Sequence, residues 1–351
     1  MSLTPTGPIP ADILIIGDAP SQWDVSRGSI FSSEQLGALL LKAGLLKTSC
    51  FITSLVDIQP PNDDINEWLS DRKTCPGPGW IPLKGKWVSP EIALGIERIY
   101  AQLSEIQPRL IIALGPASLF ALTGKMGIQK WRGSRLSVPD TECPVLPTYS
   151  PYDLKNSPEL EPILISDLKR AKAIYEGTQN PRRYQFITAP VFDDASETLD
   201  YLIARADNIP LSSPDTLRLA GDLETRAGHI ACFGIAWSAS EALCIPVLRA
   251  SETDPFYWPL EQEIVLVEKL QTLFRHPKIL WLGQNYLYDT QYFERFWGFL
   301  PLNVHDTMIA HHAMYSNRRK GLDFLSSLYA EDHIYWKDES KDWDADLGEE
   351  Q

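Results

Sequence analysis

Short apolar runs alternate with helical patterns throughout the first half of the chain, and this alternation limits the possible folds more than any other feature. Residues 11–17 read Ala-Asp-Ile-Leu-Ile-Ile-Gly, and residues 110–114 read Leu-Ile-Ile-Ala-Leu. Such runs are typical of strands buried on both faces of a parallel sheet that helices cover. We expect strands at 11–17, 50–56, 110–114 and 145–149, and helices at 34–45, 91–105, 116–122 and 157–175.

A polar segment at 176–184, broken by glycine and proline, leads into a second pattern. A chain of 351 residues is longer than one that usually folds around a single hydrophobic core, so two domains are expected. Three successive strand patterns predict an antiparallel meander, and the strand–helix units after it predict a mixed sheet. The expected strands lie at 185–188, 217–223, 230–237, 242–247 and 278–282, and the helices at 195–206, 258–274, 286–297, 306–315 and 321–330. The predicted parts are an α/β domain with a parallel sheet (1–178), a mixed-sheet domain (184–336) and an acidic tail (337–351).

The composition is that of a globular protein, with 44% hydrophobic and 22% charged residues. No apolar run reaches the roughly 18–20 residues that cross a bilayer, and the N-terminus lacks a secretory pattern. The five cysteines are scattered and form no C-x-x-C pair, which indicates a reducing compartment without disulfides or a zinc ribbon. The formal net charge of −14 disfavours a protein that coats DNA non-specifically, but it allows an enzyme that holds a strand end through metal ions.

Two carboxylates in the second half have the spacing of a metal site on a strand. Asp222 and Glu224 are separated by Leu223, so both point to one face of the strand while Leu223 points to the other. Like charges this close are costly unless a cation neutralises them, and oxygen ligands suit Mg²⁺ or Mn²⁺. The alternative is a pair of solvent-facing carboxylates at a strand end.

Further motifs follow in a fixed order. The residues are Asp-Leu-Glu-Thr at 222–225, Gly-Gln-Asn-x-x-Tyr-Asp at 283–289, Asp-Thr-Met at 306–308 and Gly-Leu-Asp-x-Leu at 321–325. In order and spacing they resemble the proofreading domain of family-A DNA polymerases, over about residues 184–330. By itself, Asn285 also fits the plainer role of a helix cap.

The resemblance implies an RNase H-like fold of the DEDD (DnaQ-like) 3′→5′ exonuclease class. It assigns Asp222 and Glu224 to the catalytic metal and Asp289 to a second metal. Two such metals clamp the scissile phosphate, activate a water and stabilise the leaving 3′-oxygen. Asn285 and Tyr288 are expected to contact the terminal nucleotide. The implied substrate is DNA with a single-stranded or frayed 3′ end, in the cytoplasm of a bacterium or a phage-infected host.

One element of that family is missing from the sequence. A further Tyr-x-x-x-Asp helix supplies the last metal ligand there, and this chain stops where that helix is due. Tyr335 and Glu339 have a related spacing but come early, and Asp344 and Asp346 lie in the acidic tail. Three explanations stay open: a fragment of a longer polymerase, a ligand from another chain, or a disabled site.

The first half carries a second resemblance. Gly-Asp-Ala-Pro at 17–20, Ile-Phe at 30–31, the segments 54–61 and 108–115, and Pro-Val-Leu-Pro-Thr-Tyr-Ser-Pro at 144–151 follow in order. They resemble the uracil-DNA glycosylase superfamily, in particular its iron–sulfur branch, over about residues 10–175. The resemblance assigns Asp18 to positioning water and Phe31 to stacking on a flipped base.

The same segments depart from that family where its chemistry resides. Ser54 stands where the family has Asn, the cluster cysteines are missing, and Ser150-Pro151-Tyr152 replaces His-Pro-Ser. A glycosylase needs a donor for the charge that develops on the leaving base, and serine is a poor one. We therefore expect no iron–sulfur cluster and weak or absent glycosylase activity.

Our interpretation is a 3′→5′ exonuclease module of a phage or bacterial DNA polymerase, behind a degenerate glycosylase-like domain. Its partners are DNA and a polymerase domain or other replisome proteins, with no membrane. The alternatives are a DNA-binding scaffold in which both sites have decayed, and an active uracil or damaged-base glycosylase. Three weaker patterns allow other sites. They are zinc at Asp306 with His305, His311 and His312; phosphate contacts from Arg318, Arg319 and Lys320; and DNA contacts from Lys125, Lys130, Arg132 and Arg135.

Overall fold

The chain forms two compact units. Unit 1 comprises Met1–Pro181 together with Asp323–Asp338, and unit 2 comprises Arg182–Leu322 together with Glu339–Gln351. In the computed structural model, the described residues are 2–71, 73–139, 141–178, 183–188, 190–249, 255–330, 333 and 335. No helix in these ranges is long and apolar enough to cross a membrane.

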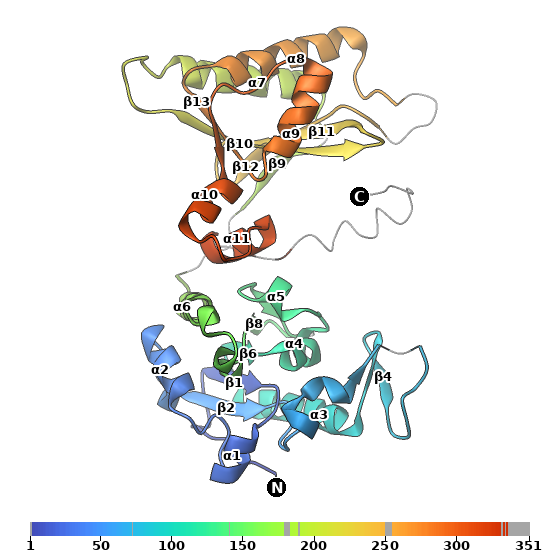
Figure 1. Cartoon of the computed structure of the whole chain (residues 1–351), viewed down its shortest axis with the longest axis vertical. Coiled ribbons are helices and arrows are strands. Elements are labelled where there is room, and N and C mark those ends of the chain that lie inside the picture. The colour runs from blue at the N-terminus through green and yellow to red at the C-terminus, as the bar shows by residue number, and fades with distance from the viewer. Residues whose placement is uncertain are drawn as a thin grey trace. The chain divides into compact units, whose positions relative to one another are not determined.

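Unit 1 is built on a five-stranded sheet with the order β2-β1-β6-β8-β7 (Figure 1). Its strands are β1 (Ile13–Gly17), β2 (Cys50–Ser54), β6 (Leu110–Leu114), β7 (Leu136–Ser137) and β8 (Pro144–Thr148). All neighbours pair in parallel except β7, which runs antiparallel to β8. The four parallel strands confirm the predicted ones, because apolar residues of β1, β2 and β6 are buried on both faces.

Helices cover both faces of this sheet. On one face, α2 (Gln35–Lys42) and α6 (Glu161–Tyr175) pack on the side chains of Ile13 and Ile15. On the other face, α3 (Pro90–Ile106) and α4 (Pro116–Thr123) pack on Leu14 and Ile16. The remaining helices of this part are α1 (Gln22–Arg27), α5 (Ile128–Trp131), and the short 3-10 turns η1 (Lys47–Ser49), η2 (Pro61–Asp63), η3 (Ile65–Trp68), η4 (Pro151–Lys155) and η5 (Pro158–Leu160).

A small second sheet lies within the stretch 60–90, where the sequence analysis predicted neither a strand nor a helix. Its strands are β3 (Leu69–Ser70), β4 (Ile81–Leu83) and β5 (Lys86–Val88), in the order β3-β5-β4. Lys84 and Gly85 both have positive φ, and a two-residue turn of this kind matches the twist of a hairpin. Strands of two or three residues are too short to show a periodicity, which explains why the prediction was wrong here.

Unit 2 contains a six-stranded mixed sheet with the order β14-β13-β10-β11-β12-β9. Its strands are β9 (Gln185–Ile187), β10 (Leu217–Arg226), β11 (His229–Ala236), β12 (Glu241–Pro246), β13 (Ile279–Gly283) and β14 (Val304–Asp306). β10, β11 and β12 form the predicted antiparallel meander, and β13 and β14 add in parallel beside β10. This is the RNase H-like arrangement that the family resemblance implied. The short strand β14 was not among the strands that the sequence predicted.

One face of this sheet is the core of unit 2. The helices α7 (Phe192–Asp207) and α8 (Leu260–Arg275) lie along this face of the sheet (Figure 1). Their apolar residues pack on Leu219, Leu223 and Phe233. After β13 the chain turns into α9 (Leu287–Tyr292), which continues as the π-helical turn η6 (Phe293–Trp297). α10 (Thr307–Met314) follows β14.

The helix α11 (Leu322–Tyr329) was predicted to belong to the second domain, but most of it packs in unit 1. Phe324 joins the same apolar core as α2 and α6, and Tyr335 packs edge-on against Trp131. Unit 1 is therefore discontinuous in sequence, because residues after Leu322 complete its core.

Candidate functional sites

The strand β10 presents two carboxylates on one face. Its residues alternate strictly between buried and exposed from Leu217 to Glu224, so Leu223 enters the core while Asp222 and Glu224 face away from it. The sequence spacing predicted this division, since side chains of a strand point alternately to its two faces. The two carboxylates are thus neighbours on the open side of the sheet.

Asp289, one turn into α9, comes to the same strand. Its side chain is 3% exposed, and Oδ1 accepts a hydrogen bond from the Leu223 backbone amide at 3.0 Å. Burial raises the pKa of Asp289 to about 6, with smaller contributions from the charges of Asp222 and Glu224, against the lowering effect of the Leu223 amide. The structure therefore brings Asp289 to the strand that carries Asp222 and Glu224, which lie more than sixty residues earlier in the sequence.

The turn that carries Asn285 is fixed by a residue whose structural role the sequence analysis missed. Asn285 is exposed and has a left-handed backbone, with φ of 56°. Its amide donates to Asp306 Oδ1 at 3.2 Å, and the Tyr286 amide donates to Oδ2 at 2.8 Å. Asp306 Oδ1 also accepts from the Met308 amide at 2.8 Å and so caps α10. An Asp directly before a helical pattern is the signal that pointed to this role.

Tyr288 lies beside the carboxylates. It is 42% exposed, and its hydroxyl is 3.1 Å from Thr225 Oγ1, on the residue after Glu224. The Tyr288 hydroxyl also donates to the Tyr292 hydroxyl at 3.4 Å. The tyrosine is thereby held over the end of β10 with its ring partly open to solvent.

A second candidate site is a cavity of about 1060 Å³ in unit 1, at the carboxyl ends of the parallel strands. Ligands of open α/β sheets bind at this edge. Its lining includes four carboxylates (Asp18, Asp63, Asp64 and Asp153) against the ammonium group of Lys155. Burial raises the pKa of Asp18 to about 6, although its Oδ1 accepts a hydrogen bond from the Ser118 amide at 2.7 Å.

Phe31 is covered rather than open. Its side chain is 1% exposed and lies against Gly17, where any side chain would collide with the ring. Tyr152 stacks on it with ring centroids 5.1 Å apart and an interplanar angle of 17°. The Tyr152 hydroxyl donates to the buried Asp24 carboxylate, so the tyrosine is held on Phe31 from its far end.

The two halves match different families. Residues 4–172 match the family model described as "Uracil DNA glycosylase superfamily", and residues 191–351 match the one described as "3'-5' exonuclease". The chain joins a uracil-DNA-glycosylase-like segment to a 3′→5′ exonuclease-like segment. We call unit 1 the glycosylase-like unit and unit 2 the exonuclease-like unit.

A curated relative of the glycosylase-like segment is the "Type-4 uracil-DNA glycosylase" of Sulfurisphaera tokodaii. It is 29% identical over 185 residues, which make up 50% of this chain and 73% of the relative.

Similar solved structures include two RNase D proteins and NrnC. Escherichia coli RNase D is 18% identical with a TM-score of 0.31, covering 46% of this chain and 36% of that one. Trypanosoma brucei RNase D is 18% identical with a TM-score of 0.36, covering 47% and 54%. Brucella melitensis NrnC with bound Mg²⁺ is 16% identical with a TM-score of 0.28, covering 43% and 63%. The chain thus spans less than two thirds of the length of each of these structures.

The carboxylates of the exonuclease-like unit suit a hard cation by their chemistry. Asp222, Glu224 and Asp289 offer only oxygen donors, and the negative charges of Asp222 and Glu224 add to the effect of burial in raising the pKa of Asp289. Among the described residues, however, no three His, Cys, Asp or Glu side chains are grouped closely enough to hold a metal ion as they stand. Tyr335 belongs to unit 1, while Glu339, Asp344 and Asp346 lie outside the described residues.

The zinc alternative finds no support in the described part of the exonuclease-like unit, where no such group occurs. His311 is buried, whereas His305 and His312 are exposed. Burial lowers the pKa of His311, and the charges of Arg318 and Lys320 lower it further.

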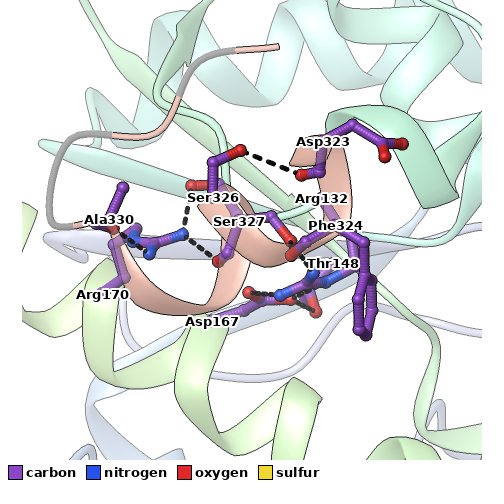
Figure 2. Close-up of polar contacts among 10 residues, drawn as sticks. Arg132, Thr148, Asp167, Arg170, Asp323, Phe324, Ser326, Ser327 and Ala330 are labelled. Carbon is purple, nitrogen blue, oxygen red and sulfur yellow. Dashed lines mark hydrogen bonds and ion pairs between the residues drawn. The ribbon is translucent and has the colours of Figure 1, made fainter. Parts of the chain in front are cut away.

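The basic cluster considered for DNA contacts is partly internal. Arg132 and Asp167 are both 0% exposed and form a two-point ion pair, with Arg132 Nε 2.8 Å from Asp167 Oδ2 (Figure 2). Arg132 Nη1 also donates to Ser327 Oγ of α11 at 2.5 Å. The Lys125 ammonium group lies 4.5 Å from the centre of the Trp131 ring. Arg132 is thus a structural residue, and the prediction that it contacts DNA was wrong.

Ser54 and Ser150 stand where the glycosylase family carries different residues, and both serine hydroxyls are engaged locally. The Ser54 hydroxyl donates to the Val56 carbonyl, and the Ser150 hydroxyl accepts from the Tyr152 amide at 3.3 Å. Ser150 thereby caps the turn η4, which positions Tyr152 over Phe31.

Proposed function

We propose that the exonuclease-like unit is a metal-dependent 3′→5′ DNA exonuclease of the proofreading type. The observation that carries this proposal is the placement of Asp289 against Leu223, between the positions of Asp222 and Glu224. Carboxylates are not gathered in this way for stability, because burial and mutual repulsion raise the pKa of Asp289. A cation turns that repulsion into binding energy.

Asp222, Glu224 and Asp289 would hold the metal ions. When bound, two such ions supply an activated water and stabilise the leaving oxygen of a phosphodiester. The protein's own part is to fix the ligands and the strand end. Asn285, on its strained turn, and Tyr288, held by Thr225, are the groups placed to orient the terminal nucleotide.

We take the substrate to be DNA because the motifs resemble the proofreading domain of family-A polymerases. The biological setting that follows is replication in a bacterial or phage-infected cytoplasm, with a polymerase domain as the working partner. Asp222 and Glu224 are exposed on a face of the sheet, where a single-stranded or frayed 3′ end has access to them.

The glycosylase-like unit is proposed to lack base excision. Tyr152 covers the Phe31 ring, and the cavity beside it carries four carboxylates, which repel a phosphate backbone. Ser150 is committed to capping η4. Among the residues that the structure describes, those lining the cavity include no histidine, the residue that the glycosylase family uses to stabilise the departing base.

The test is digestion of a 3′-labelled single-stranded oligonucleotide with Mg²⁺ or Mn²⁺. Asp222→Ala should reduce stepwise shortening by about a thousandfold or more, while Glu197→Gln, an exposed carboxylate on α7, should not change it. DNA binding without turnover in the unaltered protein would contradict the proposal and favour a scaffold. Release of uracil from a uracil-containing strand would overturn the proposal for the glycosylase-like unit.

A further inference from the structure

Two cysteines share the face of the sheet that carries the candidate carboxylates. In the register of β10 with β11, Glu224 is directly opposite Cys232, and in the register of β11 with β12, Gly234 is directly opposite Cys244. Directly opposite residues of antiparallel strands project to the same side. Cys232 and Cys244 are therefore diagonal neighbours, and Cys232 is adjacent to Glu224.

The two thiols lie close enough to interact, and Cys232 also lies next to the Glu224 backbone. Both cysteines are free and half-buried, so small solutes have access to them. Gly234 lies between Cys244 and Asp222 without a side chain, which leaves room beside the pair.

The surrounding strands can accommodate a bridge. Diagonal neighbours start about 7–8 Å apart at Cα, slightly more than a relaxed disulfide spans, so bonding must draw the strands together. Within the described residues, the pairing of β12 with β9 ends at Leu243↔Ile187, one residue before Cys244. On the other side, β10 has a bulge between Glu224 and Thr225. On both sides of the cysteine pair the strand pairing is interrupted, so β12 and β10 can shift there without breaking a regular ladder.

We propose that Cys232 and Cys244 form a reversible redox site beside the exonuclease carboxylates. With hydrogen peroxide, one sulfur takes up an oxygen as the O–O bond breaks and the first water leaves, and the second thiol then displaces that oxygen as a second water. The products are one disulfide and two waters. An external dithiol returns both hydrogens and breaks the bond.

The bridge pulls β11 away from its relaxed position opposite Glu224. Residues that orient metal ligands change affinity or activity by about 10–100-fold when disturbed, so the oxidised protein should be the less active nuclease. This consequence rests on the proposed exonuclease function, whereas formation of the disulfide does not.

The experiment treats the full chain with hydrogen peroxide and measures intact mass, a peptide map and exonuclease rate. We expect loss of two hydrogen atoms, a peptide linking Cys232 to Cys244, and a rate about tenfold lower that dithiothreitol restores. Cys244→Ser should have the same exonuclease rate as the unoxidised protein, and peroxide should no longer lower that rate. Cys75→Ser, which removes an exposed thiol elsewhere, should behave like the unaltered protein.

The outcomes separate the two proposals. Absence of the linked peptide, or oxidation of single thiols in its place, overturns the redox site. A linked peptide with an unchanged nuclease rate overturns the regulatory effect. A linked peptide in a protein with no nuclease activity in either state leaves the redox site standing and counts against the proposed exonuclease.

Discussion

Asp289 accepts its hydrogen bond from the amide of Leu223, the one residue that separates Asp222 from Glu224. This contact ties α9 to the middle of β10 and sets a buried carboxylate beside two others of the same charge. This arrangement lowers the stability of the protein when no cation is bound, as is usual where neighbouring carboxylates serve to bind a cation.

Replacing Asp289 by Asn should stabilise the metal-free protein at neutral pH. Its pKa is raised from 3.8 to about 6, so the folded state loses stability as the pH rises from about 4 through 6. Asn keeps an acceptor for the Leu223 amide and removes the charge. We expect a gain of roughly 1–2 kcal/mol at pH 7 that disappears near pH 4, together with loss of nuclease activity. Denaturant unfolding in EDTA at pH 7 and pH 4 measures this gain in the free energy of unfolding. Equal gains at both pH values would show that the charge of Asp289 is not its cause.

Replacing Asp306 by Ala should loosen the turn that carries Asn285. Asp306 serves the amides of Asn285, Tyr286 and Met308 at once. Loss of charged hydrogen bonds and of a helix cap should cost about 1.5–3 kcal/mol and reduce the nuclease rate. Asp306→Asn, which retains an acceptor for one side of the turn, should be intermediate in both measurements. A rate unaffected by Asp306→Ala would show that the turn does not position the substrate.

Replacing Tyr152 by Phe should weaken the glycosylase-like unit in a pH-dependent way. Burial raises the pKa of Asp24, but hydrogen bonds from the Tyr152 hydroxyl and from the Ser32 and Ser21 amides outweigh this and lower the pKa below 3.8. A lowered pKa contributes stability above the unfolded value and loses it as the pH falls through the folded value.

We therefore expect Tyr152→Phe to cost about 1.5–3 kcal/mol at pH 7, and less as the pH falls below 3.8. Tyr175→Phe removes a comparable hydroxyl that donates to the exposed Asp12 at 2.9 Å, and it should cost less. Chemical denaturation followed by circular dichroism distinguishes the two variants. An identical loss in both would mean that burial of the Asp24 contact has no energetic effect.

The contact between Arg132 and Ser327 should control how firmly α11 is held. Arg132→Met leaves Asp167 buried without its partner and should cost about 3–5 kcal/mol. Ser327→Ala should cost about 1–2 kcal/mol, whereas Ser326→Ala, whose hydroxyl bonds only within α11 at the Asp323 carbonyl, should stay within about 0.5 kcal/mol.

Limited proteolysis gives the second readout for this contact, since Tyr329 at the end of α11 is 56% exposed. Cleavage near Tyr329 should be faster in Ser327→Ala than in Ser326→Ala. Arg170, which donates to the Ser327 and Ala330 carbonyls, remains in both variants, so the difference reports the Arg132 contact alone (Figure 2). Equal cleavage rates would show that the hydrogen bonds from Arg170 hold α11 in place without the Arg132 contact.

Local pattern in the sequence predicted a large part of this protein. The apolar runs located the parallel strands, and the spacing of Asp222 and Glu224 placed both on the open face of β10. These predictions succeeded because strand periodicity depends only on neighbours along the chain. The roles of Asn285, Tyr288 and Asp18 in binding a substrate remain predictions.

Contacts between distant residues decided the rest. The sequence could not show that Tyr152 covers Phe31, that Arg132 is buried against Asp167, or that α11 completes the core of the glycosylase-like unit. It also could not place Cys232 beside Glu224. The local sequence pattern indicates which face of a strand or helix a residue lies on. The residue that it contacts depends on how the sheets and helices pack together, which only the tertiary structure shows.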